Sequence, residues 1–206
     1  MAGYRTAAGY AEGEFTEKKS RFIGQASPVG SEEEAAAFVA EVRARHREAR
    51  HNVFAWILRD GGKRASDDGE PQGTGGVPVL GVLEGSGLVD VCVVVTRYFG
   101  GVLLGVGGLA RAYGRGAKLA LEAVTVREMA LCRDYGLALP YELYGRFEHW
   151  LPEAGVHVVE SGFGEEVRLT VRLRDEDAQG FLDGARELSA AVVEPRLLKT
   201  GWDELP

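Results

Sequence analysis

The spacing of hydrophobic and polar residues changes several times along the chain, and each spacing predicts a type of element. Alternation at every second residue favours strands, whereas apolar residues three and four positions apart favour helices. The first part of the chain gives a mixed set of elements. We expect two antiparallel strands in residues 4–29, a helix over 31–50, a strand over 51–58, a loop over 60–78, a brief strand over 79–83, a strand over 88–96, and a helix ending at 123.

The first helix has a clear start in the sequence. Ser31 supplies a capping hydroxyl, Glu34 follows at the reciprocal position, and three glutamates occupy the first turn. The opposite, polar side of this helix carries arginines at helical spacing, namely Arg43, Arg47 and Arg50. Such a stripe is typical of a solvated face, and a contact with a phosphate backbone is the alternative.

The pattern restarts at residue 129. We expect a strand to residue 139, a helix over 140–154, strands over 156–161 and 166–173, a helix over 175–188, and a strand over 192–199. The order βαββαβ is that of the ferredoxin-like split motif. The sequence therefore predicts an α+β protein of two domains, residues 1–127 and 128–206.

The strand that begins near Val91 is the most informative segment. Its five consecutive apolar residues predict a strand that is covered on both faces. A glycine-rich turn follows, and glycines there suggest positive φ angles or close backbone approach. An arginine and a tyrosine at such a strand end suit phosphate and base contacts. The candidate nucleic-acid or anion-binding residues are Arg97, Tyr98, Gly100, Gly101, Gly107, Gly108, Arg111 and Arg115, with Lys18, Lys19 and Arg21 added from the second strand.

An acidic loop precedes this segment and supports several interpretations. Its polar members are Ser66, Asp67, Asp68 and Glu70. Carboxylates so placed would hold Mg²⁺ or serve as a catalytic base, and they also form turns by bonding local amides. A further interpretation pairs Asp67 or Asp68 with Arg97 or Arg111. We expect no metal and no cofactor, because histidines and cysteines lack ligand spacing and the glycine-rich turn lacks the Lys-Ser/Thr ending of a P-loop.

Charge is distributed unevenly over the 206 residues. Residues 1–127 carry 16 lysines and arginines against 15 acidic residues, a net charge of +1, whereas residues 128–206 carry 8 against 16, a net charge of −8. This asymmetry suggests two domains with different partners. The N-terminus has no signal-peptide pattern and no apolar run is long enough to span a bilayer, so we expect a cytoplasmic protein without a membrane partner.

Several motifs together resemble the YigZ/IMPACT family. They are Lys19-Ser20-Arg21-Phe22, the strand starting at His51-Asn52, the loop Ser66-Asp67-Asp68-Gly69-Glu70-Pro71-Gln72-Gly73-Thr74, and Arg97-Tyr98-Phe99-Gly100-Gly101. The resemblance implies an N-terminal domain with the ribosomal protein S5 domain 2-like fold. It also implies a ferredoxin-like C-terminal domain that is similar to domain V of elongation factor G. For bacterial members, it implies a translation-linked or nucleic-acid-binding role.

These observations lead to one main functional prediction and two alternatives. We expect a translation-linked regulator that binds RNA, the ribosome or a translation factor through the N-terminal domain. The first alternative is an enzyme of unknown reaction in which Asp67, Asp68 or Glu70 acts with Arg97. The second is a protein-binding regulator that acts through the acidic C-terminal domain.

Overall fold

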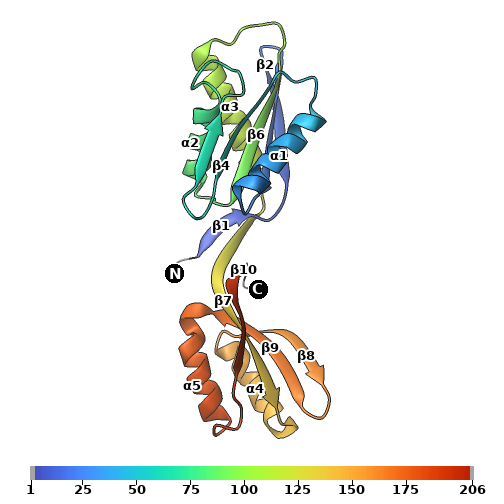
Figure 1. The fold of residues 1–206 in the computed structure, drawn as a ribbon, viewed down its shortest axis with the longest axis vertical. Coiled ribbons are helices and arrows are strands. Elements are labelled where there is room, and N and C mark those ends of the chain that lie inside the picture. Colours follow the sequence, from blue (N-terminus) through green and yellow to red (C-terminus); the bar gives the residue numbers. More distant parts are fainter. Residues whose placement is uncertain (1–2, 205–206) are drawn as a thin grey trace. The chain divides into compact units, whose positions relative to one another are not determined.

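The computed structural model describes residues 3–204 and divides the chain into two compact units (Figure 1). The first unit comprises residues 4–127, and the second comprises residues 128–204 together with Gly3. Each unit has its own hydrophobic core, and each is described here by itself.

The first unit is built on an antiparallel sheet in the order β2-β3-β6-β4-β5. Its elements are β1 (Tyr4–Ala7), β2 (Ala11–Glu17), β3 (Ser20–Pro28), α1 (Glu32–Arg45), β4 (His51–Ile57), β5 (Lys63–Ser66), α2 (Gly76–Ser86), β6 (Val91–Tyr98) and α3 (Val106–Glu122). Helices cover both faces of this sheet: α1 lies on one, and α2 and α3 lie on the other.

Strand β6 at the centre of the sheet explains the unbroken apolar run in the sequence. Val91, Val93 and Val95 point into the core formed with α2 and α3. Cys92 and Val94 point the other way, into the core under α1. All five are fully buried, as predicted for a strand covered on both faces.

The predicted cap of α1 is present, but the helix is shorter than expected. The Ser31 hydroxyl accepts the Glu34 amide at 3.3 Å, and the Glu34 carboxylate accepts the Gly30 amide at 2.6 Å. The helix ends at Arg45 rather than near Arg50.

The prediction of a brief strand over residues 79–83 was wrong. These residues belong to helix α2, and Val79 and Leu83, four positions apart, are fully buried against the sheet and α3. Short apolar runs with glycine and proline do not separate strand from helix by pattern alone, and Pro78 is tolerated because it lies in the first helical turn. The expected loop over residues 60–78 also contains the short strand β5.

The second unit has the predicted βαββαβ order. Its elements are β7 (Val126–Leu139), α4 (Tyr141–Glu153), β8 (His157–Phe163), β9 (Val167–Arg174), a 3₁₀ turn (Asp175–Asp177), α5 (Ala178–Leu188) and β10 (Arg196–Glu204). Strands β10, β7, β9 and β8 lie side by side in that order, and α4 and α5 share one core with the sheet. This arrangement confirms the expected α+β class and the ferredoxin-like motif.

Candidate functional site

The predicted site residues of the first unit converge because three antiparallel strands end or begin at the same edge. In the registers of these strands, Arg97 of β6 lies between Phe22 of β3 and His51 of β4. Tyr98 lies opposite Arg21. Residues far apart in sequence are therefore neighbours at this end of the sheet.

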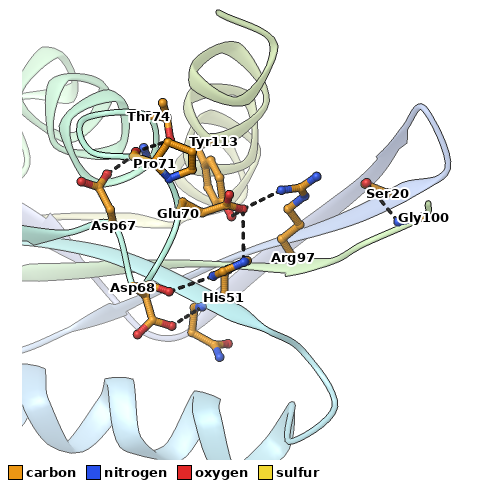
Figure 2. A network of polar contacts seen from close by, with 12 residues as sticks. Ser20, His51, Asp67, Asp68, Glu70, Pro71, Thr74, Arg97, Gly100 and Tyr113 are labelled. Carbon is orange, nitrogen blue, oxygen red and sulfur yellow. Dashed lines mark hydrogen bonds and ion pairs between the residues drawn. The ribbon is translucent and has the colours of Figure 1, made fainter. Parts of the chain in front are cut away.

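A buried cluster of polar side chains joins the acidic loop to β6 and α3 (Figure 2). Glu70 Oε1 accepts hydrogen bonds from Arg97 Nη1 at 2.7 Å and from the Tyr113 hydroxyl at 2.6 Å. The side chains of Glu70 and Arg97 are only 4% and 7% exposed. Burial, and the bond to the Glu70 carboxylate, raise the pKa of Tyr113 well above its usual range. His51 Nε2 lies 4.0 Å from the same carboxylate oxygen.

Asp67 is used as a cap for helix α2. Its carboxylate accepts the backbone amides of Gly73, Gly75 and Gly76 at 2.8, 2.9 and 2.8 Å. Partial burial alone would raise the pKa of Asp67, but the three amides favour the charged form and lower it below its ordinary value. Asp67 is thus a structural group at the start of α2.

Asp68 ties the acidic loop to the start of β4 and to α1. Its carboxylate accepts the Asn52 amide at 2.6 Å and forms an ion pair with Arg43. Its carbonyl oxygen bonds to His51 Nδ1 at 2.8 Å, and its own amide donates to the Ser66 hydroxyl at 3.2 Å.

The acidic loop therefore pairs differently from our prediction. Neither Asp67 nor Asp68 contacts Arg97 or Arg111; Glu70 is the partner of Arg97. Within residues 3–204, no group of three or more histidine, cysteine or acidic side chains is arranged to hold a metal ion. The three carboxylates are engaged by protein donors, which argues for a scaffolding role.

The turn between β2 and β3, which we call the basic turn, consists of Lys18 and Lys19. Both residues are exposed and have positive φ angles, 44° and 65°. The backbone of Gly100 lies so close to the Lys19 carbonyl that a Cβ atom at this position would overlap it. The Gly100 amide also donates to the Ser20 hydroxyl at 3.2 Å (Figure 2). Glycine is required here because the two segments touch through their backbones.

Residues 99–108, the glycine loop, connect the end of β6 to the first turn of α3. Gly101 and Gly105 have positive φ angles of 82° and 73°. Gly107 and Gly108 lie in the first turn of α3, where no side chain caps the helix. A Cβ atom at Gly107 would lie 3.4 Å from Arg111 Nη1, so this guanidinium lies beside the start of the helix.

The predicted phosphate-binding cations fall into three groups. Arg97 is buried and paired with Glu70, which leaves little of its guanidinium open to a phosphate, so its predicted phosphate contact stays a prediction. Arg21 and Arg115 are exposed but paired, with Glu14 and Glu17 respectively. Of the predicted cations, those that are exposed and have no acidic partner among residues 3–204 are Lys18, Lys19 and Arg111.

The exposed aromatic residue at this end of the sheet is Phe99, which our predicted site residues did not include. Tyr98 is half-buried, and its hydroxyl bonds to His46 Nδ1 at 2.9 Å, so it is not a free stacking surface. Phe99 is 45% exposed and packs against the Arg97 guanidinium, whose carbon lies 5.4 Å from the ring centroid. Its position one residue beyond the strand and before two glycines was the signal in the sequence.

Comparisons with known proteins cover most of the chain. The Impact N-terminal domain model matches residues 18–121, and a model described as a domain of unknown function, DUF1949, matches residues 137–191. IMPACT family member YvyE of Bacillus subtilis is 38% identical over 191 residues, spanning 92% of this chain and 88% of that protein. IMPACT family member YigZ of Escherichia coli is 41% identical over 160 residues, spanning 76% and 78%.

A solved structure agrees with these matches. The crystal structure of a hypothetical protein has a TM-score of 0.65 and 33% sequence identity, and the match covers 97% of this chain and 98% of that chain. Within residues 3–204, no helix has the length and apolar character needed to cross a membrane. On these matches over both domains, the chain belongs to the IMPACT family.

Proposed function

We propose that this protein is a translation-linked regulator that binds RNA through the basic turn and the glycine loop of its first unit. Membership of the IMPACT family supports a translation-related regulator at the level of the family. The choice of RNA as the ligand, and of this surface as its site, rests on the arguments that follow.

The observation that carries the proposal is the grouping of unpaired cations around exposed backbone. Lys18 and Lys19 have no acidic partner within the described residues, and the backbone of Lys19 lies against that of Gly100. Arg111 lies beside the uncapped start of α3, a helix of 17 residues. Free amides at a helix start and nearby cations both favour phosphate groups. In the proposed site, these cations and amides would contact the phosphates of the RNA.

The enzyme alternative receives less support from the geometry. A catalytic carboxylate needs access to a substrate, but Glu70 is 4% exposed and already accepts two hydrogen bonds. Asp67 and Asp68 are likewise committed to backbone amides and to Arg43. Docking of a partner on the acidic second unit stays a prediction.

Salt-dependent RNA binding tests the proposal. The replacement of Lys18 and Lys19 by alanine should weaken binding of a fluorescent single-stranded RNA, measured by anisotropy over a range of salt concentrations. Each lost phosphate contact lowers the slope of log K against log salt by about 0.7, so the double variant should lose about 1.4. The matched control is the double variant Lys63→Ala, Lys118→Ala, which removes two exposed lysines that pair with Glu84 and Glu122.

The proposal fails if the wild-type protein shows no salt-dependent affinity for RNA or ribosomes. It also fails if the control variant loses as much of the slope as the Lys18, Lys19 variant. Both variants change the net charge equally, so a general electrostatic effect would weaken them alike, whereas a local site would not.

One observation favours a second candidate function, which is binding of a translation factor or ribosomal protein. The glycine loop exposes Val102, Leu103 and Val106, with exposed fractions of 39%, 81% and 67%. Neighbouring exposed apolar side chains are typical of protein–protein contacts. Binding to a purified factor that survives nuclease treatment and is lost in Leu103→Ser would support this candidate instead.

A further inference from the structure

We infer that the glycine loop recognises unpaired nucleotides, with Phe99 as the surface on which one base stacks. This inference rests on the proposed RNA binding and adds the class of RNA that the site accepts. Three features carry it: the way the Phe99 ring is held, the position of the lysines beside it, and the unavailability of Tyr98.

The Phe99 ring packs on a side chain that is itself held in place. It packs on the Arg97 guanidinium, which is also 5.7 Å from the centroid of buried Phe22. Arg97 is fixed in turn by its 2.7 Å bond to Glu70. Nearly half of the Phe99 surface nevertheless remains open to solvent. A base that stacks on it would meet a ring that already packs on the guanidinium, and such pre-organisation favours binding.

The basic turn lies next to the residue that follows Phe99. Gly100 follows Phe99 directly and is in backbone contact with Lys19, so the basic turn flanks the ring. Lysine provides a flexible point charge that follows a phosphate backbone without demanding one geometry. The ring and the basic turn together therefore complement the two parts of a nucleotide, the flat base and the charged phosphate.

This arrangement favours single strands over duplexes. In a duplex the base faces are covered by neighbouring base pairs, whereas in a single strand they are free to stack on an aromatic side chain. Phenylalanine has no hydrogen-bonding group, so its contribution should not depend strongly on base identity. Tyr98 cannot substitute for it, because its hydroxyl is bound to His46 and its side chain is half-buried.

The test compares a single-stranded uridine oligonucleotide with the duplex it forms with an adenosine strand, using fluorescence anisotropy. For Phe99→Ala we expect the single strand to bind roughly five- to a hundredfold more weakly, the range for one lost stacked base. Phe99→Tyr should restore binding, because it keeps the ring. Phe163→Ala is the matched control, since it removes an aromatic ring that is more exposed, at 59%, and that lies in the second unit, outside the proposed site. It should bind RNA like the wild type.

A second measurement reports the stacking directly. A single-stranded RNA containing 2-aminopurine should lose fluorescence when it binds the wild type or Phe99→Tyr, and should keep it with Phe99→Ala at saturating protein. The slope of log K against log salt should be the same for all three proteins, because none of these changes removes a charge. Thermal unfolding of each variant confirms that it is folded.

The inference is overturned if the duplex binds as tightly as the single strand, if Phe99→Ala keeps wild-type affinity, or if Phe163→Ala loses as much as Phe99→Ala. In those cases the loss caused by Lys18→Ala with Lys19→Ala would still support the proposed RNA binding. If the wild type binds no RNA in a salt-dependent way, the proposed function itself has failed, and this inference falls with it.

Discussion

Arg97→Ala is the substitution that most sharply tests the role assigned to the buried polar cluster. It would remove the cation that neutralises Glu70 and leave that carboxylate buried, with the Tyr113 hydroxyl as its one remaining close donor. The loss of one partner of a buried ion pair costs about 3–5 kcal/mol, because the other charge stays desolvated. In a domain of this size we expect the midpoint of thermal unfolding to fall by roughly 10–20 °C.

Chemical denaturation followed by fluorescence measures this free energy. Trp56 is buried in the first unit, so it reports the unfolding of that unit once Trp150 and Trp202 of the second unit are replaced by phenylalanine in every protein compared. Arg111→Ala is the matched control. It removes an exposed arginine without an ion pair among the described residues, and it should change the free energy of unfolding by less than about 0.5 kcal/mol.

A compensated variant separates charge burial from packing. When Arg97→Met is combined with Glu70→Leu and Tyr113→Phe, no buried polar group of the cluster is left without its partner, so stability should return to near the wild-type value. A cost below about 1 kcal/mol for Arg97→Ala, or a triple variant no more stable than the single one, would refute the reasoning. The result also matters for function: loss of RNA binding in an Arg97 variant would report unfolding or loss of the guanidinium on which Phe99 packs, rather than a lost phosphate contact.

Three other substitutions test the stability of the first unit. Asp67→Asn should destabilise the first unit by about 2 kcal/mol at pH 7, because the bonds to three amides at the start of α2 lose their charge. Folding lowers the pKa of Asp67. The contribution of its carboxylate to the free energy of unfolding is therefore complete above the unfolded pKa near 3.9 and is lost as the pH falls through the folded pKa. The free energy of unfolding should consequently change less with acid pH in the variant than in the wild type. Gly81→Ala should stabilise the protein by about 1 kcal/mol, because it lies within α2 with no atom near the added Cβ. Gly24→Ala should destabilise it by about 2 kcal/mol or more, because the added Cβ would overlap the Gly116 carbonyl. Denaturant midpoints measure the effects of the two glycine substitutions. Equal effects of Gly81→Ala and Gly24→Ala would contradict the predicted difference.

The sequence predicted those elements whose signals are local. The run from Val91 to Val95 has the composition of a strand buried on both sides, and neighbouring residues do not change that interpretation. Ser31 and Glu34 cap α1 through residues three positions apart. In the second unit, β9 alternates clearly between buried and exposed positions, whereas β8 and β10 are mostly exposed and do not. The order of the elements was nevertheless read correctly, and the ferredoxin-like motif followed from it.

The partners within the site could not be read in the same way. Glu70 meets Arg97 and Tyr113 across 27 and 43 residues of sequence, and Asp67 and Asp68 have the same charge and similar surroundings in the sequence. Which carboxylate meets the arginine depends on the path of the loop between β5 and α2. That path is fixed by backbone bonds, such as those from the amides of Gly75 and Gly76 to Asp67, and not by residue type alone.

The buried cluster and the exposed loop are best understood together. Because burial of Glu70 and Arg97 carries a desolvation cost, their ion pair adds little net stability compared with apolar residues of the same size. What the pair does provide is a fixed orientation for the Arg97 guanidinium, and Phe99 packs on that guanidinium. A recognition surface works best when a second layer of contacts fixes the residues that touch the ligand. In the proposed site, the acidic loop, for which the sequence also allowed a catalytic or metal-binding role, would position the arginine on which the exposed ring packs.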